Sequence, residues 1–247
     1  MKIYFTIISI YLSYYSYSQT KEPIQADRPD QTETPAIVPK GMFQVEAGFS
    51  YQKNNSISNT LNLPSSLWKY GVNENFELRL ITEFVSEKTN DEKSSGFTPI
   101  LIGCKIKICE ENGIFPKTSF IGHIALPNAA SSKYKTLFYA PEFRFTMQHS
   151  ITEKLSLSYN LGAEWDGFST EPTFIYTLTS GYSITKKTGF YIELFGFAPQ
   201  NNNANHNIDG GLTYLITNDF MVDLSSGFGI TENAPEHYFA LGFSFRK

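Results

Sequence analysis

The sequence predicts an all-β protein, a closed antiparallel transmembrane β-barrel of about twelve strands, and three observations lead to this fold class. Polar and apolar residues alternate with a period of two in many segments, as in strands with one apolar face. After residue 20 no apolar run approaches the roughly 18 residues that a spanning helix needs. Short and long connections alternate along the chain, which is the pattern of outer-membrane barrels.

The composition agrees with this fold class. The 247 residues suffice for one large all-β domain. Aromatic residues make up 15% of the chain and charged residues only 18%, below the roughly 25% of an ordinary soluble domain. Many aromatics without long apolar runs indicate strands that are apolar on one face only. The formal net charge of −4 argues against a nucleic-acid partner.

The first eighteen residues, 1–18, have the pattern of a cleaved signal peptide. Lys2 is followed by a short apolar stretch at 3–12, and Ser16 and Ser18 place small residues before a cut at Gln19. Export of the chain follows from this prediction.

Residues 19–41 are predicted to form an extended periplasmic segment. They contain four prolines, at positions 23, 29, 35 and 39. Proline removes a backbone donor, so this spacing excludes a helix and a central strand.

Residues 42–247 are predicted to form the barrel. The stretch from Phe43 to Tyr51 is typical, with apolar residues at the odd positions and polar or small residues at the even ones. Clear alternation predicts strands at 43–51, 76–80, 100–108, 139–148, 155–165 and 239–246. Weaker alternation predicts strands at 59–70, 118–127, 172–182, 189–197, 206–215 and 219–229. The total is even, as in single-chain bacterial barrels.

The connections predict how the barrel is oriented. Short polar turns are expected at 72–75, 151–154, 184–187 and 216–219, with a longer one at 109–116. Longer polar loops are expected at 52–58, 85–96, 128–136, 166–171, 198–205 and 230–236. In outer-membrane barrels the short turns are periplasmic. Both chain termini are therefore expected on the periplasmic side of the outer membrane of a Gram-negative bacterium.

A soluble exported sandwich or a lipocalin-like barrel would also show alternation. In a sandwich, however, the outer face carries many charges. Here the second face is dominated by Ser, Thr, Asn, Gly and Gln, with a few charges of both signs. Strands of about ten residues also suit a tilted membrane span, so the membrane barrel is favoured.

The alternation places a set of charged side chains on the lumen face. They are Glu46, Glu77, Arg79, Glu83, Lys105, Lys107, Glu142, Arg144, Glu164, Glu193, Asp209 and Asp223. These groups could form a constriction that filters solutes by size and charge, with the carboxylate excess favouring cations or neutral solutes. They could equally form a salt-bridge network that fills the barrel and fixes its register.

Asp27, Arg28, Pro29 and Asp30 precede the first strand and form a second candidate site. Arg28 could reach into an acidic lumen and pair with a carboxylate there, because a guanidinium fork suits carboxylates. The segment would then be a plug or gate. The alternative is a disordered periplasmic tail.

Two N-terminal blocks, 26–34 and 38–46, form the most specific pattern in the chain. Further such stretches are 70–72, 76–79, 103–105, 125–127, 209–214, Asp223 and 227–229. Together they resemble the phenol-degradation meta-pathway transporter family of outer-membrane barrels. The resemblance implies a β-barrel transporter for hydrophobic or aromatic compounds.

The leading function is therefore passive passage of small solutes through an outer-membrane channel. A structural or adhesive barrel and a lipid-modifying hydrolase are the alternatives. The four histidines, His123, His149, His206 and His237, show no evident serine and acid arrangement. No motif indicates a metal or a cofactor. The expected partners are outer-membrane lipid and a small-molecule solute, while the substrate and the oligomeric state stay open.

Overall fold

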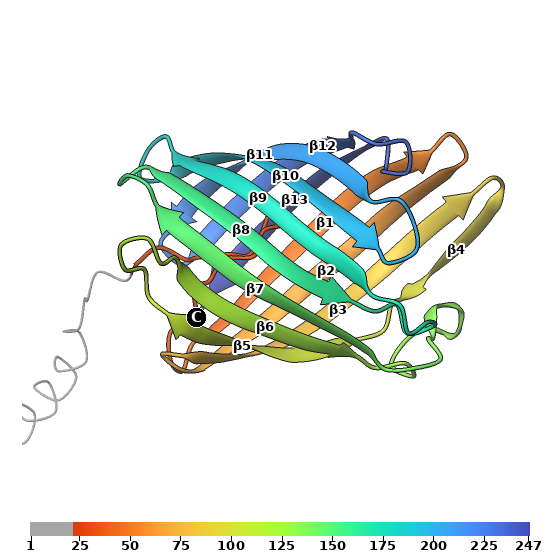
Figure 1. The fold of residues 1–247 in the computed structure, drawn as a ribbon, viewed down its shortest axis with the longest axis horizontal. Helices are drawn as coiled ribbons and strands as arrows, with labels where there is room; N and C mark the ends of the chain where they lie inside the picture. The colour runs from red at the N-terminus through yellow and green to blue at the C-terminus, as the bar shows by residue number, and fades with distance from the viewer. Residues whose placement is uncertain (1–21) are drawn as a thin grey trace, which may run out of the picture.

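The computed structural model describes residues 22–247 (Figure 1). The predicted signal peptide, residues 1–18, and positions 19–21 of the predicted N-terminal segment lie outside the described residues. Between residues 22 and 247, no helix has the length and apolar character required to cross a membrane.

Strands account for most of the described chain. Their bounds are β1 Phe43–Asn55, β2 Ser58–Asn73, β3 Phe76–Thr89, β4 Glu92–Phe97, β5 Leu101–Cys109, β6 Lys117–Ala125, β7 Ala140–Ser150, β8 Leu155–Glu164, β9 Thr173–Ser183, β10 Thr188–Pro199, β11 Asn205–Thr217, β12 Phe220–Gly229 and β13 His237–Arg246. A short 3-10 helix, η2, spans Ser132–Tyr134 in the connection between β6 and β7.

The strands close into a twelve-stranded antiparallel barrel, which confirms the predicted fold. Neighbours in the chain pair with one another, and β13 pairs with β1 over ten residue pairs from Gln44↔Arg246 to Lys53↔His237. The segments β4 and β5 lie along the same edge of β3, with β5 facing 76–81 and β4 facing 84–89, so together they occupy one barrel position. Closure gives every strand two neighbours except β4, which pairs with β3 alone. A bilayer requires such pairing because it offers backbone groups no water.

The two ends of the barrel differ. The terminal end, as we call it, carries both ends of the described chain and the turns at 74–75, 110–116, 151–154, 184–187 and 218–219 (Figure 1). The opposite loop end carries the connections at 126–139, 165–172, 200–204 and 230–236, together with two tight hairpins.

Those two hairpins replace loops that the sequence predicted at 52–58 and 85–96. β1 and β2 stay paired up to Asn55↔Ser58, and β3 and β4 up to Thr89↔Glu92. Both hairpins carry polar residues on both faces. Their sequences therefore lack the polar–apolar alternation by which the other strands were predicted. Their polar side chains bond to one another instead, as where the Asn54 side chain donates to the hydroxyl groups of Ser58 and Thr60.

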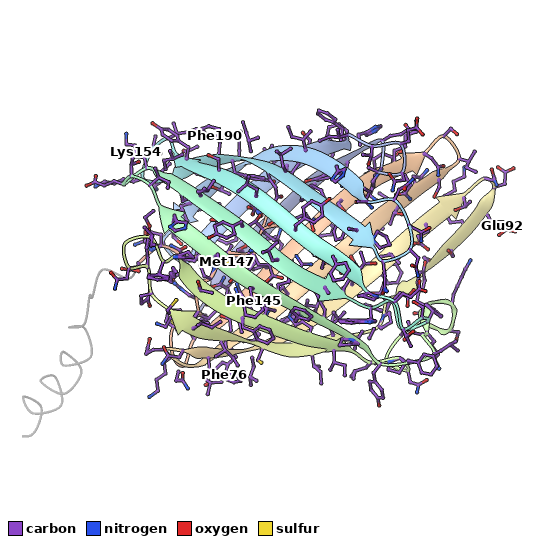
Figure 2. The ribbon with its side chains drawn as sticks, in the orientation of Figure 1. Phe76, Glu92, Phe145, Met147, Lys154 and Phe190 are labelled. Carbon is purple, nitrogen blue, oxygen red and sulfur yellow. The ribbon has the colours of Figure 1, made fainter. Side chains whose placement is uncertain are left out.

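The barrel is apolar outside and polar inside. On β3 and β5, Leu78, Leu80, Ile102 and Ile106 are between 37% and 49% exposed. Phe145 and Phe190 also lie on the outer wall (Figure 2). The most buried side chains are instead charged or polar, including Lys69, Glu77, Lys105, Glu193 and Asn160. This inverted arrangement excludes a soluble sandwich and is that of a barrel whose outer face meets lipid.

Candidate functional site

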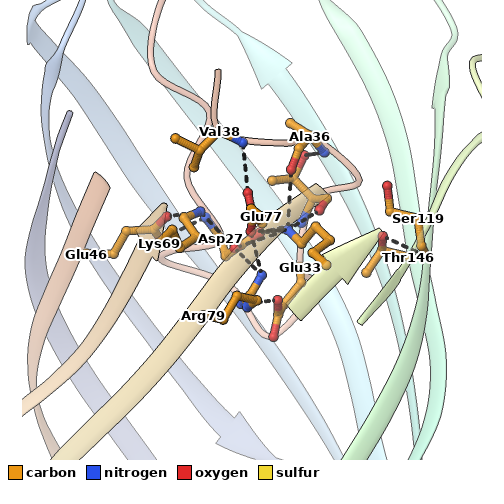
Figure 3. A network of polar contacts seen from close by, with 12 residues as sticks. Asp27, Glu33, Ala36, Val38, Glu46, Lys69, Glu77, Arg79, Ser119 and Thr146 are labelled. Carbon is orange, nitrogen blue, oxygen red and sulfur yellow. Dashed lines mark hydrogen bonds and ion pairs between the residues drawn. The ribbon is translucent and has the colours of Figure 1, made fainter. Parts of the chain in front are cut away.

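Residues 25–38, here called the lumen segment, run through the inside of the barrel. They contain no helix or strand, yet Asp27, Thr32 and Val38 are only 3–5% exposed. An extended chain cannot satisfy its own backbone donors and acceptors, so buried ones need partners elsewhere. The barrel wall supplies these partners (Figure 3).

Asp27 lies at the centre of a buried ion cluster. Its carboxylate is 2.9 Å from Lys69 Nζ on β2, 3.1 Å from Arg79 Nη1 on β3 and 2.9 Å from Lys105 Nζ on β5. Three neighbouring strands thus direct cations at one residue of the lumen segment. A carboxylate so far from bulk water is tolerated only with such compensation.

Further carboxylates balance these cations. Glu46 of β1 pairs with Lys69, while Arg79 pairs with Glu77 at 3.3 Å and with Glu33 of the lumen segment at 2.6 Å. The cluster then holds four carboxylates, counting Asp27, against Lys69, Arg79 and Lys105. With the lumen segment in place carboxylates outnumber cations by one, and without Asp27 and Glu33 the cations would be in excess by one.

The same wall carboxylates bind backbone groups of the lumen segment. Glu46 Oε2 accepts the N–H groups of Asp27 at 2.8 Å and Arg28 at 3.0 Å. Glu77 Oε2 accepts the N–H of Val38 at 2.8 Å. Hydrogen bonds to a charged acceptor are stronger than neutral ones, so these contacts fix the path of the segment.

Arg28 points away from the Asp27 cluster, toward the strands on the other side of β1. Its Nη2 donates to Asp223 Oδ1 on β12 at 2.9 Å. The guanidinium also lies over Gly48 and Gly242, which face each other across the β1–β13 seam. A Cβ at either glycine would overlap the guanidinium, so the two glycines leave the space that Arg28 occupies.

Wall side chains outside the ion cluster hold the next part of the lumen segment. Glu193 of β10 accepts the Gln31 N–H at 2.8 Å and the Thr32 hydroxyl at 2.5 Å. On β8, the Asn160 side chain accepts the Glu33 N–H at 2.7 Å and donates to the Glu33 carbonyl at 3.1 Å. Ser119 of β6 donates to the Pro35 carbonyl at 2.7 Å.

The lumen segment separates two cavities. One of about 620 Å³ opens toward the loop end and is lined by Arg28, Pro29 and Gln31 of the segment. The other, of about 780 Å³, opens toward the terminal end and is lined by segment residues 36–38. The two cavities share no lining residue.

The other predicted lumen residues line these cavities or pair near them. Glu83 and Glu164 line the loop-end cavity, and Lys107 lines the terminal-end cavity. Arg144 Nε pairs with Glu142 at 2.8 Å, and its Nη1 donates to the Gln31 carbonyl. Asp209 accepts a hydrogen bond from the Tyr238 hydroxyl.

Sequence reasoning missed several residues that hold the lumen segment. Lys69 and Asn160 lie on predicted strands, and their lumen positions follow from the alternation, but Lys69 stands in a weakly patterned strand. Glu33 and Thr32 lie in a segment without periodicity. No local signal marks their partners, because Glu33 meets Arg79 at a separation of 46 residues and Asn160 at 127.

The histidines do not assemble an evident hydrolytic centre. His123 Nδ1 lies 3.7 Å from Glu142, and Tyr176 contacts His206. Within residues 22–247, no group of three or more His, Cys, Asp or Glu residues is placed to hold a metal ion.

The chain matches a model of a known protein family. A family model described as "Putative MetA-pathway of phenol degradation" matches residues 26–246. The chain belongs to this family. The match of this phenol-degradation family begins one residue before Asp27 and therefore includes almost the whole lumen segment. A search of curated proteins finds no match by sequence.

Solved structures share the fold of this family member at low identity. An outer-membrane channel from Pseudomonas putida F1 superposes with a TM-score of 0.71 at 13% identity, covering 89% of this chain and 99% of the other. The NanC porin gives 0.54 at 12%, covering 82% and 98%. The KdgM porin, solved in complex with disordered oligogalacturonate, gives 0.53 at 11%, also covering 82% and 98%.

Proposed function

We propose that this barrel is an outer-membrane channel for passive passage of small solutes, and that its N-terminal segment is the gate. The observation that carries the proposal is that residues 25–38 lie between two lumen cavities, one open toward each end of the barrel. The wall is continuous, so a solute that crosses through the lumen must pass the place where the segment lies.

The contacts of the segment support a removable gate. It is bound by ion pairs and hydrogen bonds, with no covalent link and no strand pairing. Such contacts can be exchanged for water once the segment moves. Passage would then be downhill through a polar lumen, and the selectivity would be set by the charged side chains that line it.

The direction of the chain in the membrane is part of the proposal. Both ends of the described chain lie at the terminal end, where the turns are shorter on average. In outer-membrane barrels the end with the short turns faces the periplasm. A segment entering from the periplasmic mouth would therefore close the lumen. Family membership favours a hydrophobic or aromatic solute, for which the phenylalanines Phe195 and Phe197 offer contact in the loop-end cavity.

Planar-bilayer conductance tests the proposal directly. The mature protein and a variant lacking residues 19–38 would be refolded and measured side by side. We expect small or rare current steps from the intact chain and larger, longer steps from the deletion variant. Equal conductance of the two forms would reject the gate, and silence of both would reject the channel. Folding is checked by the heat-dependent gel mobility of barrels.

A further inference from the structure

Three carboxyl groups meet on one side of the lumen without a cation. Glu193 on β10 and Asp209 on β11 are direct cross-strand partners, and both side chains point inward, 0% and 5% exposed. Asp30 of the lumen segment directly precedes Gln31 and Thr32, which both bind Glu193, so its carboxyl group is within electrostatic range of Glu193 and Asp209. Like charges directly opposite each other on neighbouring strands repel, so this arrangement requires compensation.

The surroundings provide hydroxyl and amide donors but no lysine or arginine partner. Glu193 accepts from Gln31 N–H and from the hydroxyl groups of Thr32 and Thr179. Asp209 faces the hydroxyl groups of Tyr191 and Tyr238. Asp209 Oδ1 is buried and has no hydrogen-bond partner among the described residues.

Two arginines that lie in or against the lumen segment pair with other carboxylates. Arg28 pairs with Asp223, and Arg144 pairs with Glu142. Strands β8 to β12 contain no lysine or arginine at all. Within residues 22–247 no ion pair joins Asp30, Glu193 or Asp209 to a basic side chain. Without a cation, neighbouring carboxyl groups such as Glu193 and Asp209 repel each other when both are ionised. A proton on one of them removes this repulsion and lets the protonated group donate a hydrogen bond to the other.

We propose that Asp30, Glu193 and Asp209 form a proton-binding site that couples closure of the lumen to pH. The inference rests on the proposed gate. With the segment inside, the three groups share protons. Withdrawal of the segment removes Asp30 from the group, exposes Glu193 and Asp209 to water, and relieves their mutual repulsion.

The closed and open states differ in the number of protons bound by the three carboxyl groups, and this difference sets the direction of the pH dependence. The closed state binds more protons than the open state, so raising the pH favours opening. The effect applies above about pH 5, where a carboxyl group in water is already ionised but one of a buried group of like charges can still hold its proton.

Single-channel recording at several pH values tests the proton site. In the intact protein the ratio of open to closed time should rise with pH, by up to about tenfold per pH unit for each proton released. Asp30→Asn and Asp209→Asn should each flatten this dependence and lengthen the closed times at high pH. Glu92→Gln, at the tip of the β3–β4 hairpin (Figure 2), removes a carboxylate outside the lumen and should keep the slope.

Three outcomes would overturn the inference. They are a flat response of the intact protein, an unchanged slope in Asp30→Asn, and the same slope in the variant lacking residues 19–38. Failure of the gate itself is distinguishable, because the deletion variant would then conduct like the intact protein at every pH. If deletion raises conductance while the intact protein ignores pH, only the proton site is rejected.

Discussion

Arg28 Nη2 lies 2.9 Å from Asp223 Oδ1, joining a residue before the first strand to the strand before the last. The two residues are 195 positions apart in the chain. The Arg28 guanidinium lies over Gly48 and Gly242 at the seam where β13 meets β1, so this ion pair holds the lumen segment against the strands that close the barrel.

Arg28→Ala should raise the open probability of the channel. A hydrogen-bonded charge contact contributes about 1.5–3 kcal/mol, so its loss should shift the open-to-closed ratio by about tenfold to about a hundredfold. Bilayer recording measures the ratio. Lys53→Ala, which removes an exposed ion pair with Glu236 at the loop end, is the control and should leave gating unchanged. Unchanged gating in Arg28→Ala would show that the contact does not hold the segment.

Gly48→Ala and Gly242→Ala should open the channel in the same way, because a methyl group at either position displaces the Arg28 guanidinium. Either change combined with Arg28→Ala should add little, since the displaced group is then absent. Gly122→Ala is the control, because its added Cβ would meet only the Phe120 ring at 3.4 Å or more. Full additivity of the double variants would contradict the prediction.

Asp27→Ala should destabilise the closed, folded barrel. It leaves Lys69, Arg79 and Lys105 without the carboxylate that they share, and breaking a buried ion pair costs about 3–5 kcal/mol. Urea unfolding in lipid vesicles would measure this loss. A variant lacking residues 19–38 loses both Asp27 and Glu33 and leaves three cations facing only Glu46 and Glu77, so adding Lys105→Met to it should restore part of the stability. No gain from that second change would argue against the charge imbalance as the cause.

The deletion variant should conduct cations in preference to anions. The predicted lumen residues include eight carboxylates. Five basic groups face the same lumen, namely Lys69, Arg79, Lys105, Lys107 and Arg144. Reversal potentials in a salt gradient measure the preference. Replacing Glu193, Asp209 and Asp223 by their amides should bring the potential toward zero. Anion preference in the deletion variant would contradict the prediction.

Much of the barrel could be predicted from the sequence because the lipid face imposes a period of two. Glu193 illustrates the point, since its neighbours Ile192 and Leu194 face outward and fix its direction. The hairpin around Asn55 and Ser58 escaped prediction because a strand beyond the membrane needs no apolar face.

The partners of the lumen segment could not be predicted from the sequence. That Asp27 needs a counterion follows from its burial alone, and its burial is a property of the closed barrel. The choice of Lys105, 78 residues away, depends on the register between β3 and β5 and on how far the segment enters. Neither the register nor the depth of the segment can be derived from the polar–apolar alternation along a single strand.

The order of strands has a consequence for the open state. β3 and β10 lie six positions apart in the ring of twelve, and so do β5 and β11. Once the segment withdraws, Arg79 and Lys105 on one wall would therefore look across the pore at Glu193 and Asp209 on the other. An electric field would run across the lumen instead of along it. This field would align the dipole of a passing solute across the pore axis. The orientation of the solute, as well as its net charge, would then determine how fast it crosses.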